Sequence, residues 1–411
     1  MRKSKFITVF VGCFFLQYNA NAIDTTNGIW KNLDEQYEQT VDNKNLISTM
    51  LNNRVYYTNT YNSDNPKDEY SDAFLRSKLG LNLRLSDNFI IKSNIEFDVM
   101  PQASETVRRN QLSTGGGDKS FENEGAFIDE LALNYNYKNF SALAGKFTAN
   151  FGDAWKLQNW KLQNGIWVNE LAREYKQAEK LGFGIIQRAG DQKINGEYVF
   201  GLSAFTDDHK NLDNSIITSR DGALKTDGAL RGTRNLDSYV LSTDIYYDFG
   251  NGEKLSYHFA YLNLAINDRQ NQSNIPTSIG DEKAIALNMN YKYPINNNFL
   301  LDSFVEYTNI SNAGGDTEAT ADYLTLNFTT YIHKDFSITL AMAKKKQIKI
   351  GENGVDKSIN ELSFGYKFDD LNSALKGFFV SVGYREGKVN DKFVPIKDKA
   401  FGFLVAHKIE F

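Results

Sequence analysis

The sequence predicts an all-β protein, built as a transmembrane antiparallel β-barrel of about 16 strands. Three observations carry this prediction. Segments that alternate apolar and polar residues recur along the chain, short connections between them alternate with long polar ones, and the first residues resemble an export signal. The 411 residues are 41% hydrophobic and 13% aromatic, with a formal charge of −5, so the chain is rich in aromatic residues yet polar overall.

The composition excludes several classes of protein. One Cys rules out a disulfide scaffold or a Cys-rich metal site, and four His leave little for a His-based cluster, so we expect no cofactor and no metal. The mild acidity argues against a nucleic-acid partner. The chain has no second long apolar run, which excludes a polytopic helical membrane protein.

Residues 1–22 have the three parts of a secretory signal peptide. They combine a basic start, an apolar run and a small-x-small cleavage site, Ala-Asn-Ala, at the end. A competing interpretation is a lipobox ending at Cys13, although the apolar run continues past that residue. Export predicts that residues 23–50 form a short periplasmic leader and that residues 51–411 form the barrel.

The strands are predicted from their period of two. In residues 88–99, Phe89 and Ile91 fall on one face, while Lys92 and Asn94 fall on the other. The predicted strands start near Leu51, Phe74, Phe89, Ala126, Phe140, Leu181, Gly196, Ser238, Lys254, Lys283, Asn298, Ala321, Phe336, Ile359, Lys376 and Lys399.

The connections between these strands differ in length in a regular order. Short turns are predicted at 86–88, 138–139, 250–252, 294–297 and 333–335, and longer loops at 62–72, 101–125, 150–180, 207–237, 267–282 and 350–357. A soluble sandwich has no reason to segregate loop length to one end. A barrel with short periplasmic turns and long external loops does.

The two faces of the strands favour the same interpretation. With apolar faces turned inward, about 16 strands would enclose a lumen too wide for side chains to fill. Apolar faces turned toward lipid and polar faces lining a wet channel resolve this conflict. We expect an aromatic girdle at the short-turn end, formed by Tyr135, Tyr137, Tyr247, Phe249, Tyr291, Tyr293, Tyr366 and Phe368.

Two segments carry a resemblance to known families. An alternating last strand that ends in Phe411 resembles the assembly signal of Gram-negative outer-membrane barrels. The run from Gly145-Lys146-Phe147 to Phe151-Gly152 resembles a turn of several porin families, including the phosphate-selective type. The resemblance implies an outer-membrane porin, a 16-stranded diffusion channel for small hydrophilic solutes or ions. The resemblance also implies that the chain is handled by the barrel-assembly machinery, that it contacts outer-membrane lipid and lipopolysaccharide, and that it forms a homotrimer.

Residues 150–180, the third long loop, are the best candidate for narrowing the channel. Trp155, Trp160 and Trp167 are three of the four Trp in the chain, which is more apolar surface than a solvated loop needs. The resemblance implies that this loop folds into the lumen. The alternative is an external loop that packs on neighbouring loops or on another subunit.

The candidate pore-lining charges come from the strands and from this loop. Basic residues are expected on inward faces or beside the loop, at Arg76, Lys78, Arg84, Lys92, Lys146 and Arg188, and acidic residues on the loop, at Asp153, Glu170 and Glu174. A basic ladder that faces an acidic loop would set up a transverse field. The alternative for each residue is an ordinary solvated lumen charge. Acids are also expected on the inward faces, at Glu96, Asp98, Asp244, Asp248, Asp302 and Glu306, so the lumen is mixed and the ion preference stays open. The run Lys344-Lys345-Lys346 is expected to meet lipopolysaccharide phosphates or solvent.

Two other classes of function are the alternatives. A barrel enzyme needs an activated nucleophile, but His258, beside Ser256, lacks a G-x-S-x-G context or a clear partner, so we expect no catalytic residue. A surface-exposed barrel acting as an adhesin or host-contact protein would use loops such as 207–237.

Overall fold

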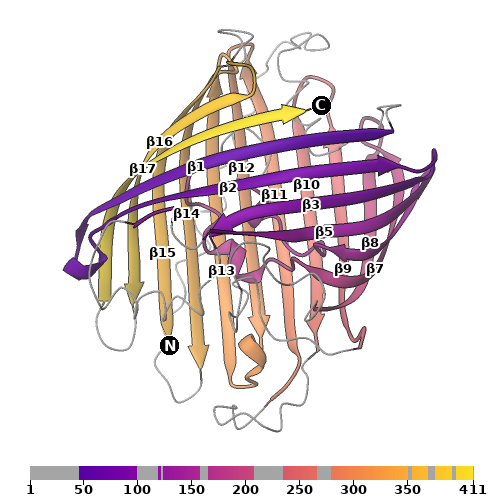
Figure 1. Cartoon of the computed structure of the whole chain (residues 1–411), viewed down its shortest axis with the longest axis horizontal. Coiled ribbons are helices and arrows are strands. Elements are labelled where there is room, and N and C mark those ends of the chain that lie inside the picture. The colour runs from indigo at the N-terminus through magenta and orange to yellow at the C-terminus, as the bar shows by residue number, and fades with distance from the viewer. Residues whose placement is uncertain are drawn as a thin grey trace.

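The computed structural model describes residues 46–99, 119–121, 124–157, 165–207, 235–265, 279–349, 354–368, 375–390 and 395–410. These residues form a closed antiparallel β-barrel of 16 strands, which confirms the predicted fold class (Figure 1). The predicted signal peptide with Cys13, most of the predicted leader, Trp160 and Phe411 lie outside the described residues.

The strands follow one another around the barrel in chain order. They are β1 (Ile47–Ser63), β2 (Ser71–Arg84), β3 (Phe89–Val99), β5 (Glu124–Tyr137), β6 (Phe140–Phe147), β7 (Lys180–Asp191), β8 (Gly196–Asp207), β9 (Ser238–Asp248), β10 (Lys254–Leu264), β11 (Glu282–Asn296), β12 (Phe299–Ser311), β13 (Ala319–Ile332), β14 (Phe336–Lys349), β15 (Val355–Lys367), β16 (Phe378–Asn390) and β17 (Pro395–Glu410). Each predicted start lies within a few residues of an observed one.

β1 closes the barrel. Leu51 in β1 pairs with Leu79 in β2 on one side and with Ile409 in β17 on the other. The two-residue β4 (Lys119–Ser120) adds a short parallel pairing to β2. Closure gives the strands a pairing partner on both sides, which is the condition for placing a sheet in hydrocarbon.

In the part of the chain that the structure describes, the helical elements are four single turns, namely η2 (Pro66–Asp68), η3 (Ala154–Lys156), η4 (Ala172–Tyr175) and η5 (Ala313–Gly315). Among the described residues, no helix is both long enough and apolar enough to cross a membrane.

Large apolar side chains cover the outer face of the strands and polar side chains line much of the inner face, as the predicted inversion requires. Exposed apolar residues cover the outer face, including Leu133, Phe183, Leu202, Phe259, Leu287, Phe328, Leu340, Phe364, Val382 and Phe403. Buried polar residues line the inner face, including Asn52, Asp98, His258, Asn288, Glu306, Asn327, Thr329, Glu361 and Ser381. This arrangement is the reverse of a water-soluble core, and it fits a barrel surrounded by lipid.

The predicted aromatic girdle is present at the short-turn end. Ring pairs join Phe336 to Tyr366 at 4.6 Å, and Tyr291 to Tyr293 at 6.1 Å, between centroids. Tyr137 and Phe249 are half-exposed beside the same turns. Such aromatic belts sit at the boundary between the apolar core and the headgroups of a bilayer.

The predicted loop lengths are wrong in the last part of the chain. Only 350–354 separate β14 from β15, and only 391–394 separate β16 from β17, whereas 368–377 join β15 to β16 at the short-turn end. Residues 355–357, predicted as loop, belong to β15 because Lys357 pairs with Lys345 of β14. The strict alternation of short and long connections therefore holds only for the earlier strands.

A charge on the outer face should destabilise the barrel in a bilayer. Leu287 is 47% exposed on β11, between outward residues of β10 and β12. We expect Leu287→Arg to lower the free energy of unfolding by about 2–4 kcal/mol in phosphatidylcholine vesicles, because hydrocarbon does not solvate the guanidinium. Urea unfolding measures this loss. Ile194→Arg, in the β7–β8 turn, is the control and should have little effect; equal losses for both variants would contradict the lipid-facing assignment.

Candidate functional site

The third long loop, between β6 and β7, lies inside the barrel. Its described parts, 148–157 and 165–179, carry η3 and η4, and they contact inward side chains of β1, β3, β9, β11, β12 and β15. In Figure 1 this segment lies between the front wall of β1, β2, β3 and β5 and the back wall of β11 to β14. Phe151 and Tyr175 are fully buried there, so the apolar residues of the loop pack inside the barrel.

A buried carboxylate of β12 holds the first part of the loop. Glu306, 1% exposed, accepts hydrogen bonds from the backbone N–H of Asp153 at 2.5 Å and of Ala154 at 3.1 Å. It also accepts one from the Tyr175 hydroxyl at 2.5 Å, and burial together with this carboxylate raises the pKa of Tyr175 well above its ordinary value. One acid thus joins two segments of the loop to the wall.

A second buried carboxylate, on β15, holds the later part. Glu361 accepts hydrogen bonds from the backbone N–H of Ile166 and, at 2.9 Å, of Trp167. The Trp167 indole packs over Gly383 and Gly402, which are register partners in β16 and β17. A Cβ atom at Gly402 would lie 2.2 Å from the indole and collide with it, and one at Gly383 would crowd Ile166 and the indole at 3.0 and 3.1 Å, so the two glycines leave room for this ring.

The loop adds basic side chains to the basic ladder of β2. Asp98 in β3 accepts from Arg76 at 2.8 Å and from Arg173 of the loop at 2.9 Å. Asp129 in β5 pairs with Lys78 at 2.7 Å, and Lys176 of the loop lies 3.9 Å away. The loop therefore shares the carboxylates of this wall with the ladder.

The acidic residues of the loop face the opposite wall. Glu174 pairs with Lys345 of β14 and lies 3.5 Å from Lys357 of β15. Glu170 pairs with Arg385 of β16 at 3.0 Å. The expected picture of a basic ladder facing an acidic loop is thus corrected: the loop is bipolar, with cations toward β2, β3 and β5 and anions toward β14 to β16.

Asp153 forms a third polar centre at the start of η3. Burial alone would raise the pKa of this carboxyl, but Lys156 and His258 hold the pKa well below its ordinary value, so Asp153 stays ionised. Asn288 donates to it at 2.8 Å, and His258 Nδ1 lies 2.6 Å from Asp244. Asp153, Asp244 and His258 are spaced closely enough to hold a cation, but Lys156 already supplies the positive charge.

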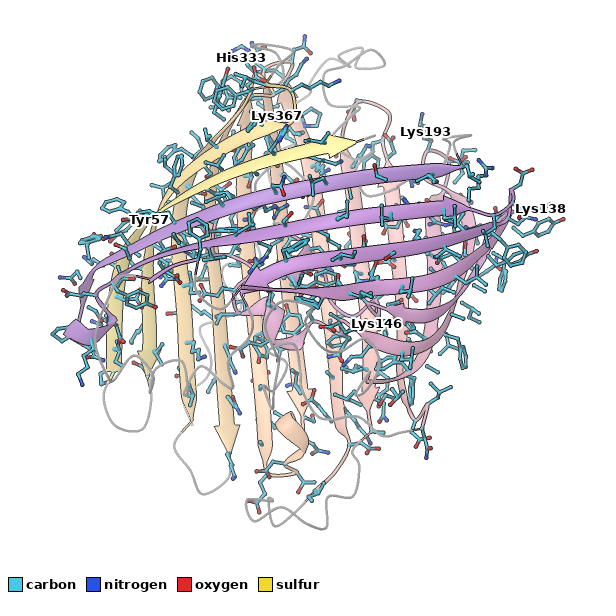
Figure 2. All side chains as sticks on the ribbon, in the orientation of Figure 1. Tyr57, Lys138, Lys146, Lys193, His333 and Lys367 are labelled. Carbon is cyan, nitrogen blue, oxygen red and sulfur yellow. The ribbon has the colours of Figure 1, made fainter. Side chains whose placement is uncertain are left out.

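The remaining predicted residues lie elsewhere. Lys146 is fully buried and pairs with Glu179 at 2.8 Å at the base of the loop (Figure 2). Arg84 pairs with Asp87 at 3.1 Å in the short β2–β3 turn, and Lys92 is half-buried opposite Asn82. Arg188 pairs with Glu197 near the β7–β8 turn, at the far end of β7 from the loop, so its expected position beside the loop is wrong.

Several residues of this site were missed from the sequence. Glu361, Lys345, Lys357 and Arg385 bind the loop from the wall, yet none of them is among the predicted site residues. The expected contact of Lys345 with lipopolysaccharide or solvent is wrong, because this lysine points inward and pairs with Glu174. Their strand parity already places them on the inner face, since Leu340, Phe364 and Val382 of the same strands point outward. The sequence offered no signal for which inward residue meets which loop residue.

Removing the Glu306 carboxylate should loosen the loop. In Glu306→Gln, an NH₂ group would face backbone N–H donors, which leaves buried donors without an acceptor. We expect the free energy of unfolding to fall by about 1–3 kcal/mol, and limited proteolysis to cut the loop faster. Glu318→Gln, an exposed acid outside the barrel wall, is the matched control. Wild-type stability and proteolysis in Glu306→Gln would contradict the anchoring role.

The chain was compared with known proteins. Its sequence matches no protein-family model and shows no significant similarity to a curated protein. A loop L8 deletion mutant of OmpT, an outer membrane protein of Vibrio cholerae, is similar in structure with a TM-score of 0.50 and 11% identity, over 88% of this chain and 98% of that chain. The outer membrane channel DcaP of Acinetobacter baumannii gives 0.49 and 13% over 88% and 96%. At this level of identity, the similarity to the OmpT variant establishes that the chain has the fold of an outer-membrane β-barrel.

Proposed function

We propose that this protein is an outer-membrane porin, which lets small hydrophilic solutes or ions diffuse through a water-filled channel narrowed by the third loop. The polar inner face of the barrel supports this proposal, because a wet lumen is the environment in which such side chains stay solvated. The charges on the loop and the wall then set the selectivity of the channel.

The charged loop, held between two walls that both carry charged side chains, carries the proposal. Side chains at its edges stay partly solvated: Arg173 is 35% exposed, Glu174 28% and Glu170 53%. A loop placed only to fill the barrel would bury neutral side chains instead. Charges that line a solute path must be both fixed and accessible, and these three are held by partners yet open to solvent.

A catalytic role is not part of the proposal. His258 Nδ1 is held by Asp244, and His258 Nε2 is buried without a hydrogen-bond partner among the described residues, so this imidazole does not face a solvated path. The adhesin alternative depended on residues 207–237, and most of these lie outside the described residues. The homotrimer also stays a prediction, which chemical cross-linking in detergent would test.

Planar-bilayer recording tests the proposal directly. Purified wild-type protein should give stepwise conductance. In Glu361→Gln the loop loses an acceptor for two backbone N–H groups, so we expect larger and noisier steps, whereas Glu318→Gln should match the wild type. The porin proposal fails if the wild type gives no steps and a variant lacking residues 150–179 gives none either.

The ion preference should respond to the loop charge. Arg173→Glu places a second carboxylate beside Asp98, so we expect the reversal potential in a KCl gradient to shift toward cation preference. Lys138→Glu makes the same change of charge in the exposed β5–β6 turn, and we expect a much smaller shift. Equal shifts for both variants would show that the loop does not line the ion path.

A further inference from the structure

A row of buried polar residues crosses the inner wall of the barrel beside η3. Asp244, His258, Asn288 and Glu306 are successive register partners across β9, β10, β11 and β12, and all four are at most 9% exposed. Asp153 of the third loop lies over this row, because Asn288 donates to its Oδ2 at 2.8 Å and its backbone N–H donates to Glu306. The row and the loop therefore bring three carboxylates and one imidazole together at the inner wall.

This cluster carries more negative charge than its own basic groups offset. Lys156 pairs with Oδ1 of Asp153, while Oδ2 of the same carboxylate lies 3.9 Å from His258 Nδ1. Among the described residues, no other lysine or arginine pairs with the three acids, so one ammonium faces three carboxylates and the imidazole. A buried charge that lacks a partner is costly, and a bound cation would remove this cost.

The spacing of the side-chain atoms fits a metal ion. One ligand atom each from Asp153, Asp244 and His258 lies within 4.8 Å of the other two, and His258 Nδ1 lies 2.6 Å from Asp244 Oδ1. The imidazole is 2% exposed, yet its Nε2 has no hydrogen-bond partner among the described residues. A buried nitrogen without a protein partner calls for an explanation such as a bound ion or water. The imidazole thus has more binding capacity than the protein itself uses.

The donor set indicates which class of metal fits. One imidazole nitrogen with two carboxylate oxygens suits Zn²⁺ and related divalent transition metals, whereas Ca²⁺ and Mg²⁺ take oxygen ligands. The Asp153 side chain is 22% exposed, which gives an ion a way in. The site needs a single imidazole, so the presence of only four His in the chain does not exclude it.

We propose that Asp153, Asp244 and His258 bind a divalent transition metal ion, such as Zn²⁺, between η3 and the wall of β9 and β10. Asp153 comes from the loop and the other two ligands from the wall, so the ion ties the loop to the barrel beside the Glu306 anchor. This inference rests on the proposed function only in its consequence for the channel, because metal binding itself does not require that solutes pass.

Titration with Zn²⁺ tests the site. Full-length protein in detergent is stripped with EDTA, and the binding of Zn²⁺ is followed by isothermal titration calorimetry. The wild type should bind one ion per chain, whereas His258→Gln and Asp153→Asn should each bind at least about tenfold more weakly, because each variant lacks a ligand. His333→Gln, in the exposed β13–β14 turn, is the matched control and should bind as the wild type does (Figure 2).

Two further measurements separate this site from adventitious binding. X-ray absorption at the zinc edge should show an imidazole nitrogen at about 2.0–2.1 Å in the wild type and not in His258→Gln. Lys156→Gln should bind Zn²⁺ more tightly, because it removes a competing cation, whereas mere disturbance of the loop would weaken binding. The site is overturned if the wild type, His258→Gln and Asp153→Asn bind Zn²⁺ equally, or if the imidazole signal is absent. Heat-modifiability on gels verifies folding, and Asp153→Asn decides if His258→Gln does not fold.

Conductance distinguishes the metal site from the porin proposal. In planar bilayers, Zn²⁺ should reduce the noise of the wild-type steps relative to EDTA and leave His258→Gln unchanged. Equal noise of the wild type in Zn²⁺ and in EDTA would overturn the tie between loop and wall. Zn²⁺ binding that depends on His258, in a protein without any conductance, would remove the porin proposal and leave the metal site standing.

Discussion

Hydrocarbon offers no hydrogen-bond partner to a polypeptide backbone, and the rest of this structure depends on that constraint. It requires the sheet to close, which β1 does by pairing with both β2 and β17. Closure in lipid then inverts the ordinary sidedness of a protein, so that Leu287 is exposed while Glu306 is buried. The negative mean hydropathy of the chain, −0.47, follows from the same inversion, since every strand gives half of its side chains to the polar interior.

A polar interior changes what a loop inside it must satisfy. In an apolar core, a segment is held by shape and by the hydrophobic effect. Here the wall presents carboxylates and basic side chains, so ion pairs and hydrogen bonds to these groups hold the third loop. Arg173 pairs with Asp98 on one side, and Glu174 pairs with Lys345 on the other. Trp167 packs its flat ring against a glycine pair of the wall.

The sequence was sufficient for the barrel because its determinants are local. The period of two and the turn residues act within a few positions, so the strand starts and the outer and inner faces could be predicted. The contacts of the third loop could not be predicted in this way. Arg188 and Lys146 both flank residues 150–180 in sequence, yet one lies near the distant turn and the other is buried against Glu179. The direction of β7 carries Arg188 away from the loop, and the packing at the base of the loop buries Lys146. Neither effect can be predicted from a short stretch of sequence. The prediction of residues 355–357 as loop is wrong for a related reason, because pairing with β14 extends the strand despite their polar composition.

The two classes of contact that hold the loop differ in their response to salt. Ion pairs such as Glu170 with Arg385, where the acid is 53% exposed, are screened over about 8–10 Å at physiological ionic strength. The hydrogen bonds from backbone N–H groups to Glu306 and Glu361 are buried, and salt screens buried interactions far less. A loop held only by the first class would shift as the electrolyte in the lumen changed. Because two buried carboxylates hold its backbone, we expect the loop to keep its position while its exposed charges respond to the ions around them. In the proposed channel, this separation would let one element set both the width and the charge of the pore.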